Sequence, residues 1–328
     1  MSALRTRGSE LRHGARRLAR RAFRPPAGPA RDLPPPAPLG GKLEITYACN
    51  LRCGFCYTDS PRRTLQRTPE LSDAEWLAVA DELIEIGAIE AVVTGGEPLL
   101  RSDLTIEVCR RLAAAGLGVT LNTNGWFVDD EVASRLAAAP GLQVHVSVDG
   151  PSPEVHDASR GIPGSWRRAI LGLDALIRHG VAVHAVHVVT AANADLVEET
   201  LDLLVELGVG AIAVTRVIEV GAAAREGGWR VASGQLERAV ARAQRGAGED
   251  ARIALRGGEG GVDSLRARRP PSALLVRPDG AVRTDSLNPF AFGRVPRDGL
   301  ATSWERVRER WRDPRVEAWR SKIACMSR

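Results

Sequence analysis

The chain has 328 residues, of which 44% are hydrophobic and 26% charged, and its formal net charge at pH 7 is +5. This composition is typical of a globular protein with a sizeable core, and the lack of any apolar run of about 18 residues argues against a transmembrane helix. The charge is uneven: residues 1–38 carry nine arginines against Glu10 and Asp32, or +7, which leaves a net −2 for the rest of the chain.

The first predicted region is a basic arm and linker over residues 1–38. Arginines alternate with leucines up to residue 24, and the proline-rich stretch that follows cannot continue a helix, because proline lacks the backbone donor. We interpret the arm as a poorly ordered extension, with contact to a leader peptide, an acidic partner or a membrane surface as the alternative. The arm has no interleaved aromatic residues, so binding to nucleic acid is not expected. No signal-peptide core is present, and we therefore expect a cytoplasmic protein.

The second predicted region, residues 39–250, alternates short β-branched runs with amphipathic helical segments. The predicted strands are 43–46, 91–94, 119–122, 144–148, 181–189 and 211–215. The predicted helices are 72–87, with Ser72 as N-cap, and 102–115, 128–139, 166–179 and 195–208. This alternation predicts an α/β fold with a parallel sheet, and six such units suit a partial (β/α)6 barrel of the TIM type.

Polar motifs follow the predicted strands at their carboxyl ends, which is where α/β barrels build their sites. They are TGGEP (94–98), NTNG (122–125), SVDG (147–150), TAAN (190–193) and TR (215–216). A cysteine loop follows the first strand, with Cys49, Cys53 and Cys56 in the stretch CNLRCGFC.

Three thiolates at this spacing can converge on one metal centre. Sulfur ligands favour zinc, copper(I) or an iron–sulfur cluster. A structural zinc site would need a fourth Cys or His, and none lies nearby in the sequence. Three thiolates on a four-iron cluster would leave one iron open for another molecule.

Together the motifs resemble those of the radical S-adenosylmethionine (SAM) enzymes. CNLRCGFC has the family's C-x3-C-x-aromatic-C form, and TGGEP, NTNG, SVDG and HDASRG (156–161) follow in the family's order, so that the resemblance covers residues 42–216. It implies that Cys49, Cys53 and Cys56 hold a 4Fe–4S cluster whose fourth iron is chelated by SAM. It also implies reductive cleavage of SAM to a 5′-deoxyadenosyl radical, which abstracts hydrogen from the substrate.

The same resemblance implies a set of SAM contacts. Gly95, Gly96 and Glu97 would meet the amino group, Ser147 and Arg160 the carboxylate and ribose, and Phe55 and the Thr190 loop the adenine. The complete expected cofactor-binding set is Phe55, Gly95, Gly96, Glu97, Asn124, Ser147, Asp149, Arg160, Thr190 and Asn193. Simpler interpretations exist: the glycines could form an ordinary turn, Asp149 a cap or turn, and His156 with Asp157 a tie within a loop.

The third predicted region, residues 251–328, is a small α+β domain. Short strands are expected in ARIALRGG and SALLVRPDGAVRTD, the latter with a hairpin turn at Asp279–Gly280, and helices in 301–322. The region resembles the start of the SPASM and twitch domains, but Thr284 and Asp285 stand where an auxiliary-cluster cysteine would be expected. Only Cys325 follows, so we predict a degenerate domain and a single cluster, with Cys325 either a remnant or a hydrogen-atom donor to the substrate radical.

The leading hypothesis is a radical SAM enzyme that acts on a ribosomally synthesised peptide by crosslinking, epimerisation or a related modification. The alternatives are an enzyme acting on a small-molecule natural product such as a sugar or nucleoside, and a non-catalytic binding protein derived from this fold. The expected partners are the substrate and an electron donor such as ferredoxin or flavodoxin. By location alone, Arg216, Glu219 and Asp285 are candidate substrate contacts.

Overall fold

The computed structural model of the chain describes residues 33–60, 62, 69–229, 231, 233–248, 251–256 and 270–326. The basic arm expected at the amino end therefore falls outside the described residues up to position 32. Residues 33–328 form one compact unit, to which the following description applies.

The described strands form one sheet in the order β10-β9-β8-β1-β2-β3-β4-β5-β6-β7. Their bounds are β1 Gly40–Glu44, β2 Glu90–Thr94, β3 Gly118–Thr123, β4 Gln143–Ser147, β5 Ala182–Val189, β6 Ala211–Arg216, β7 Arg252–Arg256, β8 Ala273–Val276, β9 Ala281–Arg283 and β10 Gly293–Arg294. Neighbours from β1 to β7 are parallel, β8 is parallel to β1, and β9 and β10 continue antiparallel.

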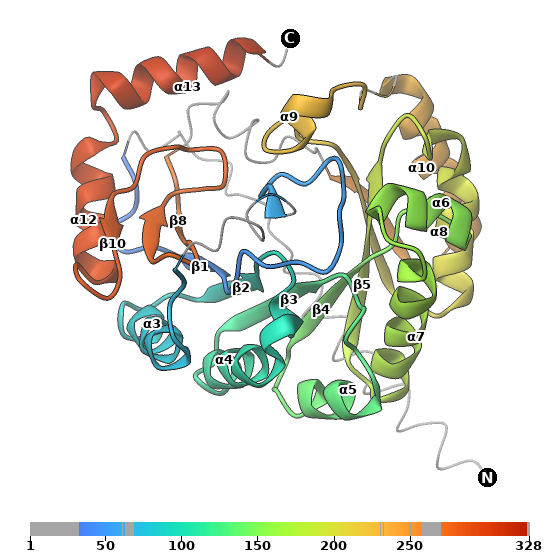
Figure 1. The fold of residues 1–328 in the computed structure, drawn as a ribbon, viewed down its shortest axis with the longest axis horizontal. Helices are drawn as coiled ribbons and strands as arrows, with labels where there is room; N and C mark the ends of the chain where they lie inside the picture. Colours follow the sequence, from blue (N-terminus) through green and yellow to red (C-terminus); the bar gives the residue numbers. More distant parts are fainter. Residues whose placement is uncertain are drawn as a thin grey trace. The chain divides into compact units, whose positions relative to one another are not determined.

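The longer helices between successive parallel strands lie along the outside of the curved sheet, while the segment after β1 lies on its inside (Figure 1). The helices are α3 Asp73–Glu85, α4 Ser102–Ala114, α5 Asp130–Ala137, α6 Pro153–Arg160, α7 Ser165–Arg178, α8 Val197–Glu206, α9 Ala223–Glu226, α10 Ser233–Ala247, α12 Leu300–Arg310 and α13 Pro314–Met326, with 3-10 turns η1 Pro98–Arg101 and η2 Ala194–Leu196. The predicted N-cap is confirmed: the Ser72 hydroxyl accepts from Glu75 N, and the Glu75 carboxylate accepts from Ser72 N in return.

The core lies between the sheet and these helices. Along β4, Val144 and Val146 are fully buried, whereas His145 and Ser147 are only half-buried, because successive side chains of a strand point to opposite faces. Val144 and Val146 pack into the core on the helix side, and His145 and Ser147 line the concave side of the sheet. Cys109 of α4 is fully buried in this core, as its apolar neighbours predict.

The α/β fold class and its parallel sheet are confirmed, and the six predicted core strands lie within three residues of the observed bounds. The structure differs at the expected boundary near residue 250. Residues 252–256 form β7, which pairs in parallel with β6, and β8 pairs in parallel with β1, so the sheet is continuous across that boundary. The sequence pattern marks these residues as strands, but it carries no information on which strand each one pairs with. The predicted turn at Asp279–Gly280 does join antiparallel strands, β8 and β9.

Candidate functional site

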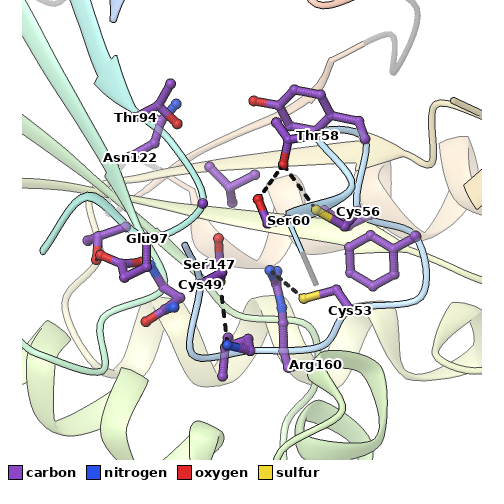
Figure 2. A pocket seen from close by; sticks show the side chains of 18 of the residues that line it. Cys49, Cys53, Cys56, Thr58, Ser60, Thr94, Glu97, Asn122, Ser147 and Arg160 are labelled. Carbon is purple, nitrogen blue, oxygen red and sulfur yellow. Dashed lines mark hydrogen bonds between the residues drawn. The ribbon is translucent and has the colours of Figure 1, made fainter. Parts of the chain in front are cut away.

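One pocket of about 440 Å³ opens on the inside of the sheet, at the carboxyl ends of the parallel strands. The expected site residues that line it are Cys49, Cys53, Phe55, Cys56, Gly95, Gly96, Glu97, Asn124, Ser147 and Arg160. Figure 2 shows several of them around a common space, with Glu97 and Ser147 on the strand side and the cysteines on the loop after β1. The fold thus brings together residues separated by more than 100 positions in the sequence.

The three thiols of the loop are half-buried and form no disulfide. Leu51 N donates to Cys49 Sγ over 3.4 Å, and the Thr58 hydroxyl lies 3.2 Å from Cys56 Sγ. Burial raises the pKa of Cys49 to about 12 and that of Cys53 to about 11, although the Arg160 guanidinium opposes the change at Cys53. Because the thiolate is the ligating form, binding of a metal centre has to offset this cost of burial.

The chemistry of the donor set fits an iron–sulfur cluster. Three thiols line the pocket, and sulfur-only donors are the usual ligands of such clusters. Within the described ranges, no group of three or more His, Cys, Asp or Glu side chains gathers closely enough to hold a single metal ion. A four-iron cube is larger than one ion, and its corners need thiols that lie further apart.

The Gly95–Glu97 segment packs directly against the start of the cysteine loop. Gly96 N donates to Thr46 O over 2.7 Å, and Glu97 N donates to Ala48 O over 2.8 Å. A Cβ on Gly96 would collide with the carbonyl oxygen of Ala48, so this approach requires glycine. The second glycine of the motif is therefore needed to join the two loops, whatever ligand they hold.

Glu97 is 1% exposed and anchors the next strand. Its carboxylate accepts from the Thr123 hydroxyl over 2.7 Å, from Asn124 N over 2.7 Å and from Leu99 N over 3.1 Å. Burial raises the pKa of Glu97 to about 7, against the effect of these three donors. Because these three donors bind the Glu97 side chain, Glu97 holds Asn124 and the adjoining pocket wall in place.

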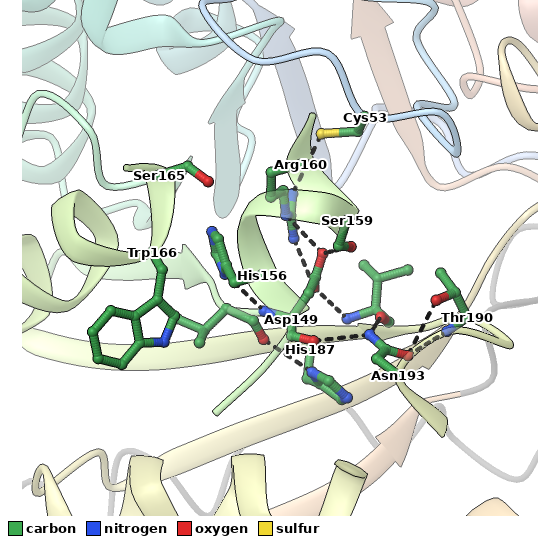
Figure 3. Close-up of polar contacts among 12 residues, drawn as sticks. Cys53, Asp149, His156, Ser159, Arg160, Ser165, Trp166, His187, Thr190 and Asn193 are labelled. Carbon is green, nitrogen blue, oxygen red and sulfur yellow. Dashed lines mark hydrogen bonds and ion pairs between the residues drawn. The ribbon is translucent and has the colours of Figure 1, made fainter. Parts of the chain in front are cut away.

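Arg160 and Asp149 form a buried ion pair behind the pocket (Figure 3). Arg160 Nε lies 2.7 Å from Asp149 Oδ2, and Arg160 Nη2 donates to Asp149 Oδ1 over 2.8 Å. Arg160 Nη1 points toward Cys53 Sγ at 4.0 Å, and its guanidinium lies over the Phe55 ring at 5.4 Å. Asp149 therefore fixes a guanidinium that faces a thiol of the cysteine loop.

Asp149, Thr190 and Asn193, which the sequence resemblance implies as cofactor contacts, are not among the residues that line this pocket. Asn193 Nδ2 donates to Asp149 O over 2.9 Å, and Asn193 Oδ1 accepts from Thr190 N over 2.7 Å. These residues brace the segment that carries Asp149, which lies just beyond the end of β4 at Ser147.

The simpler interpretation holds for His156 and Asp157. His156 Nδ1 accepts from Asp149 N over 3.1 Å, and the Asp157 carboxylate accepts from Gly164 N, the Ser165 hydroxyl and Trp166 N at the start of α7. His156 thus ties α6 to the segment before it, and Asp157 ties α6 to the start of α7. Cys325 belongs to α13, but its side chain lies outside the described residues.

The sequence interpretation missed several lining residues. Tyr57, Thr58 and Ser60 line the pocket just after the third cysteine, and His145 lines it from β4. His145 could have been found, since it stands two residues before Ser147 on the same face of one strand. Arg216 lines the pocket as expected and pairs with Glu237 over 2.6 Å, whereas the Asp285 carboxylate accepts from Leu287 N and Asn288 N within its own turn.

The sequence matches one known protein family, described as the Radical SAM superfamily, over residues 43–204. An AdoMet-dependent heme synthase of Oleidesulfovibrio alaskensis is 31% identical over 194 residues, which are 59% of this chain and 49% of that protein. The mycofactocin maturase MftC of Mycolicibacterium smegmatis is 36% identical over 182 residues, 55% of this chain and 45% of the relative. The matches therefore span about half the length of these relatives.

Among solved structures, Streptococcus suis SuiB bound to S-adenosylmethionine aligns with a TM-score of 0.66 at 16% identity, covering 87% of this chain and 68% of SuiB. SuiB bound to its precursor peptide SuiA aligns with the same TM-score, at 15% identity over 86% of this chain and 66% of SuiB. At these identities the similarity demonstrates a shared fold. Within the described part of the chain, no helix combines the length and apolarity that crossing a membrane requires.

Proposed function

We propose that the chain is a radical SAM enzyme with one 4Fe–4S cluster and a ribosomally synthesised peptide as substrate, because residues 43–204 match the Radical SAM superfamily. Enzymes of this family use a 4Fe–4S cluster and SAM. One observation carries the proposal: Cys49, Cys53 and Cys56 line the same pocket as Gly96, Ser147 and Arg160.

In this proposal the three cysteines hold the cluster, and the glycine loop, Asn124 and Ser147 surround SAM. When bound there, the two cofactors supply one-electron cleavage of SAM and hydrogen abstraction from an unactivated C–H bond. The chain itself orients and shields the reactants. Arg160 balances negative charge at Cys53, Asp149 keeps Arg160 in place, and Phe55 provides an apolar wall that is 8% exposed.

The peptide substrate is supported by the names of several relatives. MftC is a maturase, a Ruegeria pomeroyi relative of 29% identity is a PqqA peptide cyclase, and SuiB has been solved with a precursor peptide. A single cluster is supported by the sequence, in which Cys325 is the only cysteine after Cys109, whereas an auxiliary cluster takes several thiolates. The electron would come from a ferredoxin or flavodoxin.

A small-molecule substrate is the second candidate, because the relatives also include heme synthases, one of them 34% identical over 178 residues. Coexpression separates the two candidates. A mass change in a short peptide encoded beside this chain supports the first, while an unmodified peptide together with turnover of a small molecule supports the second.

The cofactor part is tested by anaerobic reconstitution with iron and sulfide, followed by reduction in the presence of SAM. The wild-type chain should bind about four irons and release 5′-deoxyadenosine. Replacing Cys49, Cys53 and Cys56 together by Ala should abolish both. Cys109→Ala is the matched control, since this thiol lies in the core and should leave the iron content unchanged. A wild-type chain that binds one zinc and no iron would refute the proposal.

A further inference from the structure

A cluster of charged side chains lies beside the pocket on the concave side of β1 and β8. It consists of Lys42, Glu44 and Arg277. Lys42 and Glu44 lie on either side of the fully buried Leu43 in β1, so they point away from the core. Arg277 follows the last residue of β8, and its Nε lies 3.0 Å from Glu44 Oε2. The pair is almost completely buried, with 5% of the Arg277 side chain and 2% of the Glu44 side chain exposed.

The cluster is connected to the pocket. Lys42 Nζ donates to the Tyr57 hydroxyl over 2.8 Å, and Tyr57 lines the pocket. Glu44 pairs in register with Thr94, which also lines the pocket. The Lys42 side chain keeps 29% of its surface accessible, although β1 is flanked by β2 and β8. Its accessible surface therefore faces the space inside the sheet.

The cluster has more hydrogen-bond donors than its own residues use. Lys42 and Arg277 share the Glu44 carboxylate, and the Asp279 carboxylate and the Tyr47 side chain also act on Arg277. Lys42 donates to the hydroxyls of Tyr57 and Ser286. Burial alone would lower the pKa of Lys42, but the neighbouring Tyr57 hydroxyl and Glu44 carboxylate raise it above its ordinary value, so the ammonium stays charged. Among the described residues, buried Arg277 Nη2 has no hydrogen-bond partner. A buried donor without a partner is costly unless a ligand supplies an acceptor.

We propose that Lys42 and Arg277 bind a carboxylate of the substrate. A carboxylate would accept hydrogen bonds from the accessible Lys42 ammonium and from Arg277 Nη2, the donor that has no partner among the described residues. The Arg277 fork that favours phosphate is not free, since Nε is turned to Glu44. The inference rests on the proposed function in taking a peptide as the ligand of this pocket. In a peptide the carboxylate belongs either to an acidic side chain or to the carboxyl terminus.

The competing explanation is purely structural. The Glu44–Arg277 pair could serve only to join β1 to β8, in which case added carboxylates would leave Lys42 unaffected. Lysine occurs in this chain only at positions 42 and 322, which allows a direct observation of one of them. Protein carrying isotope-labelled lysine gives two sets of side-chain NMR signals, and Lys322→Arg assigns them.

The reconstituted protein would be titrated with three probes. Acetylglutamate methylamide carries a side-chain carboxylate, acetylglycine carries a terminal one, and acetylglutamine methylamide is the neutral control. We expect a saturable shift of the Lys42 signals with at least one carboxylate and none with the amide. Which carboxylate acts identifies the source, and Arg277→Gln should weaken its binding by about tenfold or more.

No Lys42 shift with either carboxylate, or an equal shift with the amide, would overturn the proposal. Unchanged carboxylate affinity in Arg277→Gln would show that Arg277 is not part of the site. If that variant fails to fold, the titration of the wild-type protein still tests the proposal. Iron content and 5′-deoxyadenosine release are measured on the same sample. A sample that passes those assays but shows no Lys42 response refutes the carboxylate site alone, whereas a sample without iron refutes the proposed function.

Discussion

His156 is a buried histidine that the fold holds in its neutral form. Its Nδ1 accepts from Asp149 N over 3.1 Å, and a proton on Nδ1 would place two donors against each other. Burial lowers the pKa of His156 from 6.5 to about 4, with the Arg160 guanidinium adding to the effect and Asp149 opposing it. The pKa of His156 is lower in the folded state than in the unfolded state. Its neutral form therefore stabilises the folded state fully only above pH 6.5, and this contribution to the free energy of unfolding is lost as the pH falls toward 4.

We therefore predict that His156 contributes to acid destabilisation. The loss between pH 6.5 and 4 should approach about 3 kcal/mol, from 2.5 units of pKa at about 1.36 kcal/mol each. Urea unfolding of the wild type and of His156→Asn across this range measures it, because the Asn oxygen can accept the same bond without titrating. His179→Asn, at the more exposed end of α7, is the control. The same pH dependence in all three proteins would contradict the prediction.

The sequence predicts which residues come together around the pocket, but it does not predict which of them line the pocket and which lie behind its wall. The cysteines, Gly96, Ser147 and Arg160 line one pocket, because motifs at the carboxyl ends of parallel strands must share one rim. Asp149 belongs to the same motif as Ser147 and yet lies behind Arg160. Strand β4 ends at Ser147. The alternation of side chains that would have put Ser147 and Asp149 on one face therefore does not continue to Asp149.

The contact between the Gly95–Glu97 segment and the cysteine loop is the element-scale feature on which the pocket depends. Gly96→Ala would drive a methyl group into the carbonyl oxygen of Ala48 and separate the two loops. We expect a loss of about 2 kcal/mol or more in the free energy of unfolding. Gly210→Ala is the matched control, since an added Cβ there meets nothing within 4 Å. Equal, small effects of the two substitutions on the urea midpoint would show that the loops are not closely packed.

Most elements could be predicted because each carries its own periodic signal. A short β-branched run predicted β4, and the Ser72 cap predicted the start of α3. The sequence predicted the presence of a strand better than it predicted which strand pairs with it. Residues 252–256 were recognised as a strand, but only the three-dimensional structure pairs them with β6 as β7.

At the scale of the whole molecule, the two ends of the described chain meet around β1. This strand pairs with β2 on one side and with β8 on the other, at Gly40↔Ala273 through Leu43↔Val276. Helix α12 packs into the same core through Leu300, Trp304 and Val307, and Leu300 N donates to Glu82 Oε2 of α3 over 2.6 Å. The carboxyl-terminal region therefore completes the sheet and core of the barrel.

This arrangement predicts that a fragment of residues 33–250 does not fold as an independent domain. Removing β8 leaves β1 with an unpaired edge, removing β7 leaves β6 with another, and the apolar side chains of α3 that contact α12 become exposed. Size-exclusion chromatography and urea unfolding of this fragment should reveal aggregation or a non-cooperative transition, where residues 33–328 give a single cooperative one. A monomeric fragment with the urea midpoint of the longer chain would instead mean that residues 251–328 are a separate domain, as the sequence alone suggests. The comparison thus decides whether the barrel ends at β6 or continues through the carboxyl-terminal strands.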